Sequence, residues 1–234
     1  MLTMKDDEDE DQDEQELENL SFTLRSLPDY LPCRCTIDGG RTQIVVRPLR
    51  REDVVDFYAT MKEAAAAGTG YGYDEIGSLA YFVRWFVDDK YNLVYELATP
   101  HSGNDTSFKA GNQKKSTVVG YNNFGPSFYS RSHQKPALFD GNIVLRPEFR
   151  GRRWVNDLTK IRMGIGVDCG VLSFFEESLI TNVAATRGLS RTGATVCGTI
   201  PRNTYVFDSG FVDSVLFYKS LDESHSFRLA NSIV

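Results

Sequence analysis

Three arginines stand where a predicted strand gives way to a predicted helix. Arg150, Arg152 and Arg153 follow the apolar residues Val144 and Leu145 and precede a stretch with helical periodicity. The first amide groups of a helix have no intrahelical partner and carry a partial positive charge. Together with the arginine charges, they make this turn suited to bind a pyrophosphate. A solvated, arginine-rich surface turn is the alternative interpretation.

Two carboxylates and one amide are candidates for acid–base chemistry. Asp140 and Glu176 lie on or beside predicted central strands, where either could serve as a general base. Asn142 lies on an otherwise apolar strand, and a buried amide must find hydrogen-bond partners. It is therefore a candidate for orienting an acceptor or a catalytic water. Ordinary solvation at a strand edge is the alternative for both carboxylates.

An aromatic and acidic segment between two predicted helices is a candidate binding wall. Tyr71, Tyr73 and Asp74 lie within the sequence Gly-Tyr-Gly-Tyr-Asp-Glu of residues 70–75. Aromatic rings next to carboxylates suit a cationic or polar amine. A plain glycine-rich turn is equally consistent with this pattern.

The histidines and cysteines argue against several kinds of catalytic site. His101, His133 and His225 are scattered over predicted loops, without the spacing of a helical metal site. Cys33 and Cys35 are separated by one residue, and no CxxC pair accompanies them. We therefore expect reduced thiols, no metal and no Ser-His-Asp hydrolase.

The periodicity of apolar residues predicts the elements that position these candidates. Strands are predicted over residues 43–47, 91–98, 117–124, 138–145, 171–176, 194–200 and 212–219. Helices are predicted over residues 51–67, 74–88, 154–167 and 182–191. Asn182 suits the N-cap of the last helix, and Phe82, Trp85 and Phe86 share a helical spacing that predicts core positions. The order is β-α-α-β-β-β-α-β-α-β-β, and the arginine turn joins the fourth strand to the third helix.

Charge is distributed unevenly along the 234 residues. The formal net charge is -6, but residues 1–20 hold ten acidic side chains against Lys5, a local charge of -9. We expect this block to be a disordered acidic tail, because like charges repel and little there can be buried. The rest carries +3 and is long enough for one well-filled core. We expect a lead-in segment at residues 21–42, one domain at 43–221 and a C-terminal tail at 222–234.

The sequence carries no signal for a membrane or for nucleic acid. No apolar run approaches the roughly 18 residues of a membrane helix, and the acidic start does not resemble a signal peptide. A charge of +3 on the body without a groove-reading motif does not favour nucleic-acid binding. We expect a cytoplasmic or nuclear protein without a membrane partner, either monomeric or homodimeric.

The element order and three motifs together resemble the GNAT superfamily of acetyl-CoA-dependent N-acetyltransferases. Arg-Gly-Arg at 150–152, after Leu-Arg-Pro at 145–147, falls where that family has its R-x-x-G-x-G/A turn. Asn-Val-Ala-Ala at 182–185 looks like the family's N-x-x-A/S helix start. Residues 198–201 and 212–219 resemble the closing strand pair of small-amine members, including the proline-analogue N-acetyltransferases. The resemblance covers roughly residues 43–221 and implies an α/β (α+β) fold, with a central mixed twisted sheet of about six to seven strands flanked by about four helices.

The resemblance also implies a role for each part of the turn. Backbone amides would bind the coenzyme pyrophosphate, namely those of Arg150, Gly151, Arg152, Arg153, Trp154 and Val155. A strand amide near Val144 and Leu145 would polarise the thioester carbonyl, and Asn182 would lie beside the sulfur end of the pantetheine. The acceptor amine would enter from the opposite side of the splayed central strands. The sequence departs from the family where Arg153 and Val155 replace small residues, and where Leu189 replaces the tyrosine that protonates the leaving thiolate.

The resemblance implies an acyltransferase that uses acetyl-CoA as co-substrate. We expect transfer of the acetyl group, by direct attack, to a primary or secondary amine of a small molecule or amino acid. A protein acetyltransferase that acts on a lysine or an N-terminal amine is one alternative. An acyl-CoA-binding pseudoenzyme is another, motivated by Arg153, Val155 and Leu189.

Overall fold

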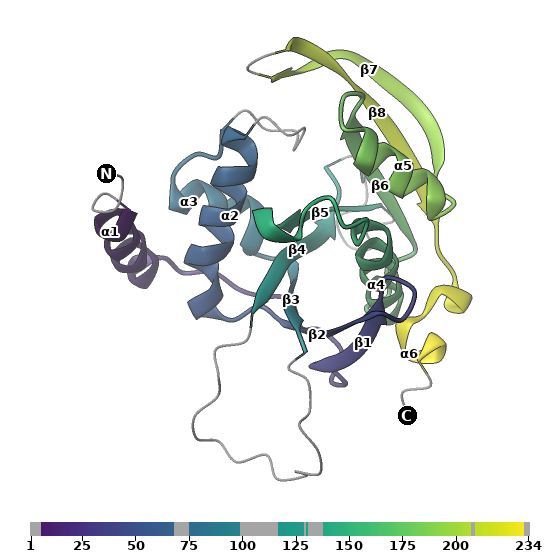
Figure 1. Cartoon of the computed structure of the whole chain (residues 1–234), viewed down its shortest axis with the longest axis horizontal. Helices are drawn as coiled ribbons and strands as arrows, with labels where there is room; N and C mark the ends of the chain where they lie inside the picture. The colour runs from purple at the N-terminus through teal and green to yellow at the C-terminus, as the bar shows by residue number, and fades with distance from the viewer. Residues whose placement is uncertain are drawn as a thin grey trace.

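A mixed, twisted sheet forms the centre of the molecule (Figure 1). The computed structural model describes residues 6–67, 75–98, 117–128, 130, 138–206 and 209–231, and for residues 6–11 and 229 it describes the backbone alone. The strands are β1 Cys33–Ile37, β2 Thr42–Pro48, β3 Tyr91–Leu97, β4 Val118–Pro126, β5 Phe139–Leu145, β6 Ser173–Leu179, β7 Thr195–Val206 and β8 Gly210–Ser220. Within the described residues they form one eight-stranded sheet in the order β1-β2-β3-β4-β5-β6-β8-β7. All seven predicted strands are present with shifted ends.

Strand β1 is the one that the sequence pattern did not predict. It pairs antiparallel with β2 through a tight turn, in which Asp38, Gly39 and Gly40 all have positive φ angles of 56°, 62° and 90°. Glycine and aspartate tolerate this left-handed conformation, so the Gly-Gly pair closes a hairpin. The expected six to seven strands therefore become eight, and the lead-in segment 21–42 supplies one of them.

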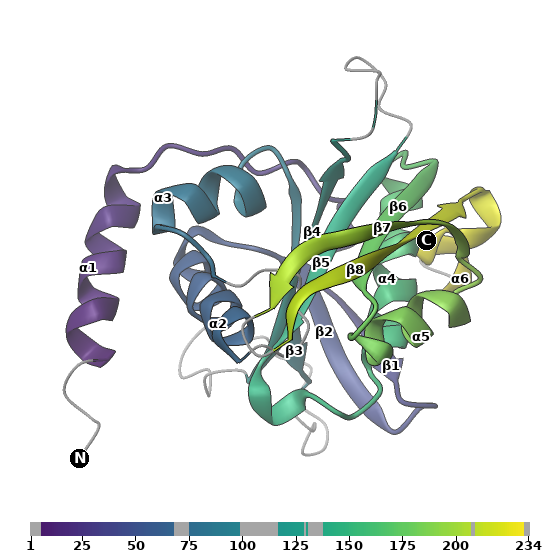
Figure 2. The same ribbon diagram turned by 90° about the horizontal axis from the view of Figure 1, so that it is seen from above.

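Helices cover both faces of the sheet (Figure 2). They are α1 Asp6–Asn19, α2 Val54–Ala66, α3 Leu79–Phe82, α4 Val155–Asp168, α5 Val183–Arg191 and α6 Phe227–Ala230. The predicted helix at 74–88 is instead the short α3, continued by the π-helical turn η2, Val83–Val87. On one face, α2 and α3 pack on Val94, Tyr121 and Val144; on the other, α4 packs on Leu93 and Leu145. Adjacent residues of one strand thus pack into two different hydrophobic cores, one on each face of the sheet.

The acidic N-terminal segment is helical, which differs from the expected disordered tail. Leu17 of α1 is buried in the core formed by α2 and α3. Nη2 of Arg51 donates to the carbonyl oxygen of Leu17 and, at 2.8 Å, to that of Leu20. Glu16 Oε1 accepts a hydrogen bond from the amide of Ala80 at 3.2 Å. A cation at the carbonyl end of a helix and one buried leucine give this charged segment an anchor that its composition does not reveal.

Both flanking segments pack on α4. Asp168, at the end of α4, accepts hydrogen bonds from the Tyr30 hydroxyl at 2.6 Å, the Ser226 hydroxyl at 2.5 Å and the Arg228 amide at 3.0 Å. Phe227 packs so closely on Gly164 that an added Cβ there would lie 2.9 Å from the Cβ of Phe227. Residues 222–231 are therefore part of the folded unit and differ from the expected C-terminal tail.

Strands β5 and β6 form the parallel pair in this part of the sheet, and they separate almost at once. Their register contains one pair, Phe139 opposite Phe174, at the start of each strand. Beyond this pair β5 stays with β4, while β6 pairs along its whole length with β8. The two strands therefore diverge toward Leu145 and Leu179, and the candidate site lies where they separate.

Candidate active site

Two cavities on opposite faces of the sheet meet at this divergence. The larger, with a volume of about 620 Å³, lies on the side of α3, and we name it the α3 cavity. The smaller, of about 120 Å³, lies against α4 and α5, and we name it the α4 cavity. Both are lined by the same residues of β5 and β6, which are Gly141, Asn142, Glu176, Glu177 and Leu179. A group in one cavity can therefore reach a group in the other through the sheet.

A turn rich in unpaired amides leads into α4. After the 3-10 turn Pro147–Phe149, Gly151 and Arg153 have φ angles of 75° and 64°. No side chain caps α4, and no amide of residues 151–157 donates to another backbone group of the described chain. These amides and the helix dipole favour an anion. The turn for which the sequence predicts a pyrophosphate site thus presents unpaired amides at a helix start, and Arg153 adopts the conformation for which glycine is the usual residue.

The side chains of Arg150 and Arg152 contact residues within the turn and on the neighbouring elements. Arg150 Nε donates to the Leu145 carbonyl at 2.9 Å, and its guanidinium forms an ion pair with Glu63 of α2. Arg152 lies over two stacked rings, with Cζ 5.3 Å from the centre of the Phe149 ring and 5.1 Å from that of Trp154. Trp154 is buried, so its contribution to a ligand is restricted to its backbone.

Strand β5 directs amides into the gap. The amide of Arg146 donates to the Val119 carbonyl, and the amide of Asn142 donates to Asn123 Oδ1, both on β4. Since successive amides of a strand alternate in direction, those of Ile143 and Leu145 point away from β4, toward the divergence. The Val144 amide points toward β4, and its side chain is buried under α2. Of the two predicted strand positions, Leu145 is therefore the one whose amide faces the gap.

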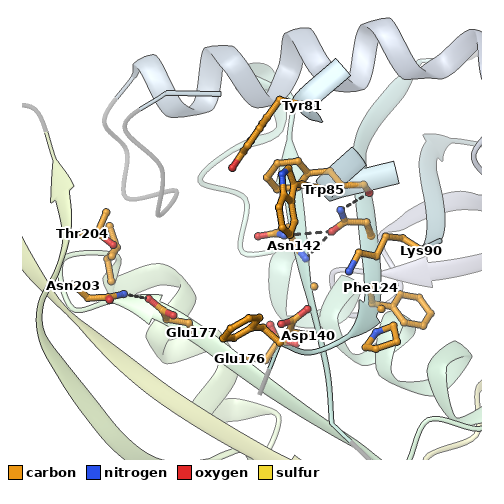
Figure 3. A pocket seen from close by; sticks show the side chains of 17 residues that line it. Tyr81, Trp85, Lys90, Phe124, Asp140, Asn142, Glu176, Glu177, Asn203 and Thr204 are labelled. Carbon is orange, nitrogen blue, oxygen red and sulfur yellow. Dashed lines mark hydrogen bonds between the residues drawn. The ribbon is translucent and has the colours of Figure 1, made fainter. Parts of the chain in front are cut away.

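Glu176 is a buried carboxyl at the junction of the two cavities. It forms an ion pair with Arg162 of α4, which is 2% exposed. Burial, with a smaller contribution from the nearby charge of Asp140, raises the pKa of Glu176 to about 7 against the opposing effect of Arg162. Burial also raises the pKa of Asp140, opposed by a hydrogen bond from Ser127 and by the charge of Lys90. The two predicted carboxyls are thus brought together as a coupled pair (Figure 3).

Asn142 is held in the gap by two asparagines of β4. Its backbone amide and its Nδ2 donate to Asn123 Oδ1 at 3.0 and 3.3 Å, and its carbonyl accepts from Asn122 Nδ2 at 2.6 Å. Asn123 Nδ2 in turn donates to the Phe86 carbonyl at 2.6 Å. The sequence analysis missed Asn122, Asn123 and Arg162. Their signal is a pair of amides inside an apolar strand and a charge on the apolar face of a helix.

Helix α5 frames the α4 cavity. Asn182 caps this helix as predicted, because its Oδ1 accepts a hydrogen bond from the Ala185 amide at 3.0 Å. Asn182, Val155 and Leu189 all line the α4 cavity. The hydroxyls on this lining belong to Thr159 and Ser178, and that of Thr159 donates to the Val155 carbonyl at 2.7 Å.

Aromatic side chains of α3 and η2 form part of the described wall of the α3 cavity. The candidates Tyr71, Tyr73 and Asp74 lie outside the described residues. Phe82 and Phe86 are buried as predicted, but Trp85 is 54% exposed and lines the α3 cavity together with Tyr81. Residues 82 and 86 share one helical face, whereas 81 and 85 share the next one round.

The described residues contain no group of three or more His, Cys, Asp or Glu side chains that could hold a metal ion. No described helix has the length and apolar character needed to cross a membrane.

Solved structures provide the comparison with known proteins. Searches of protein-family models and of curated sequences find no match. A GCN5-related N-acetyltransferase from Kribbella flavida is 18% identical, with a TM-score of 0.61 over 76% of this chain and 98% of its own. The protein yncA from Salmonella typhimurium, solved with its cofactor acetyl-CoA, is 17% identical, with a TM-score of 0.57 over 77% and 95%. A spermidine N-acetyltransferase from Vibrio cholerae, in complex with CoA and spermine, is 11% identical, with a TM-score of 0.57 over 76% and 95%.

At sequence identities this low, the comparison establishes the fold of the chain. The neighbours are aligned over nearly their whole length. The chain therefore has the fold of the GNAT N-acetyltransferases.

Proposed function

We propose that this protein transfers the acetyl group of acetyl-CoA to an amine. One observation carries the proposal: two cavities on opposite faces of the sheet meet between β5 and β6 at a carboxyl with a pKa of about 7. A donor on the α4 side and an acceptor on the α3 side can thus meet at one point. Neighbours whose structures hold acetyl-CoA or CoA support the choice of donor.

The residues of the α4 side suit the coenzyme. Unpaired amides at residues 151–157 offer hydrogen bonds and a positive dipole to the pyrophosphate. The amide of Leu145 faces the gap, where it can donate to the thioester oxygen. Negative charge develops on this oxygen during attack, so a donor fixed in advance stabilises the transition state more than the ground state.

The carboxyl pair of Asp140 and Glu176 serves as the base in this proposal. An ammonium group first loses a proton to the pair, directly or through water. The neutral nitrogen then attacks the acetyl carbon, a C–N bond forms, and the C–S bond breaks. The thiolate of CoA departs and takes up the second proton of the amine. A base with a pKa near neutrality is suited to the first step, because it is available and still basic at physiological pH.

Arg162 acts as a positioning residue for Glu176. Its guanidinium contacts the Glu176 carboxyl and lies with Cζ 4.9 Å from the centre of the Phe174 ring. Packing on this ring and burial in α4 fix the direction from which the guanidinium meets the carboxyl. Glu176 thereby remains ionisable in a site where burial alone would keep it protonated.

Release of free thiol from acetyl-CoA tests the proposal. The protein is mixed with acetyl-CoA and, in separate reactions, with each member of a panel of small amines, amino acids and peptides. Turnover with small amines supports the small-molecule acceptor; turnover with peptides alone points to a protein acetyltransferase. Acetyl-CoA binding without turnover on any acceptor points to a pseudoenzyme, and absence of acetyl-CoA binding overturns the proposal.

A further inference from the structure

Among the described residues, the α3 cavity contains one carboxylate that no nearby basic side chain balances. Asp140, Glu176 and Glu177 all line this cavity. Lys90 is close enough to lower the pKa of Asp140, and Arg162 forms an ion pair with Glu176. Glu177 is exposed, and among the described residues no basic side chain forms an ion pair with it.

Glu177 is also held in place. Its Oε1 accepts a hydrogen bond from Nδ2 of Asn203 on β7, and the same Nδ2 donates to the Ser214 hydroxyl of β8 at 3.0 Å. Adjacent residues of a strand point to opposite faces, so Glu177 and Glu176 project to different sides of β6. The carboxyl group of Glu177 is therefore a fixed point on the cavity wall, apart from the reacting pair.

An aromatic surface faces these carboxylates across the cavity. Tyr81 and Trp85 are 46% and 54% exposed, with ring centres 6.1 Å apart. Figure 3 shows them on one side of the cavity, Asp140 and Glu176 on another, and Glu177 with Asn203 on a third. The guanidinium of Arg84 lies with Cζ 5.7 Å from the centre of the Trp85 ring. Aromatic faces with a carboxylate nearby favour an organic ammonium ion.

We propose that the acceptor is a linear diamine or polyamine. One nitrogen lies uncharged at Asn142 and the carboxyl pair, and a second, protonated nitrogen lies between Glu177 and the rings of Tyr81 and Trp85. The inference rests on the proposed acetyl transfer and adds the class of acceptor. A single carboxylate explains the selectivity: an amine without a second charge leaves Glu177 without a cationic partner and so binds with lower affinity.

Matched pairs of acceptors test this proposal in the wild-type protein. Diaminopentane, aminopentanol and pentylamine share one reacting amine and differ at the far end, which is charged, polar or apolar. We expect kcat/KM for diaminopentane to exceed that of either other amine by about tenfold, the usual effect of one charge-assisted hydrogen bond. Equal values for the three amines, or a preference for peptides, overturn the inference while leaving acetyl transfer intact.

Two variants locate the second charge. Glu177→Gln keeps the shape and removes the charge, so it should abolish the preference for diaminopentane over pentylamine. Glu223→Gln, at an exposed position of the 3-10 turn Glu223–His225, is the matched control and should keep the preference. An unchanged preference in Glu177→Gln contradicts the assignment.

Equilibrium binding separates this inference from the proposed function. Diaminopentane should bind wild-type protein without acetyl-CoA, and about tenfold more weakly to Glu177→Gln. If no acceptor is turned over but this binding difference is found, the cation site stands and acetyl transfer fails. If diaminopentane binds both proteins equally, or neither, the cation site is wrong.

Discussion

At the scale of single residues, the carboxyl of Glu176 is the buried ionisable group at the junction of the two cavities. Glu176 has a pKa of about 7 because burial outweighs its ion pair with Arg162. Arg162 in turn has a buried Nε without a hydrogen-bond partner among the described residues. A buried pair that is incompletely satisfied is an expensive feature for stability alone, and a site that needs a titratable carboxyl accounts for it.

The raised pKa of Glu176 predicts how activity and stability depend on pH. The base must be ionised, so kcat/KM should rise with pH around an inflection near 7. For stability the sign is opposite: between the unfolded pKa, about 4.3 for glutamate, and about 7 the native protein binds the extra proton. The free energy of unfolding should therefore fall as pH rises through this window.

Glu176→Gln should remove both effects, because an amide does not titrate in this range. Rate profiles and chemical denaturation at a series of pH values measure them. Asp140, Arg162 and Lys90 all act on Glu176 or on its partner, and they remain in the variant. A variant that keeps the same inflection would assign it to another group.

The backbone conformation of Arg153 predicts that glycine at this position does not destabilise the protein, although glycine usually does so elsewhere. Its φ of 64° costs a non-glycine residue about 1 kcal/mol or more, so Arg153→Gly should leave the free energy of unfolding unchanged or raise it by up to about 1 kcal/mol. Arg152 lacks a positive φ, and Arg152→Gly is the matched control that should lower stability. Urea denaturation of both variants decides, and equal destabilisation by the two would be inconsistent with the backbone described here.

At the scale of elements, α5 connects the coenzyme side to stability through its cap. Asn182→Ala removes the acceptor for the Ala185 amide and should cost about 1 kcal/mol of unfolding free energy. The same change should weaken acetyl-CoA binding, because Asn182 lines the α4 cavity. Asn182→Asp can still cap the helix, so it should restore stability. Denaturation and coenzyme titration of the two variants separate the capping role of Asn182 from its contact with the coenzyme. If Asn182→Ala keeps both its stability and its affinity for acetyl-CoA, both roles are wrong.

At the scale of the whole molecule, Asp168 ties the two flanking segments to α4. Asp168→Ala leaves the Tyr30 hydroxyl, the Ser226 hydroxyl and the Arg228 amide without their acceptor. We expect a loss of about 2 to 4 kcal/mol, since each lost partner costs about 1 kcal/mol or more. Hydrogen exchange should accelerate in residues 21–42 and 222–231 together. Acceleration in one segment alone would mean that they are not held jointly.

The strands and helices that the sequence predicts are those whose signals are local. Alternating or helical apolar spacing marks β2 to β8, α2, α4 and α5, and the arginine turn follows from one strand end and one helix start. By contrast, α1 and the C-terminal segment contact distant partners, namely Arg51 and Asp168. A pattern within one segment does not contain that information.

The candidate site likewise contains residues that the sequence could predict and residues that it could not. Asp140, Asn142 and Glu176 could be predicted because polar residues stand out on apolar strands. Glu177 could not, because its place on the cavity wall arises from the divergence of β5 and β6, which brings β7 to the same junction.

Transfer through the gap between β5 and β6 is the central claim, and the most direct test compares wild type with Glu176→Gln. Acetyl-CoA binding and amine-dependent thiol release are measured on both proteins at the same pH. The proposed mechanism predicts equal binding, with thiol release at least about a hundredfold slower in the variant, as expected for loss of a general base. Equal rates in the two proteins, or no acetyl-CoA binding by the wild type, would contradict it.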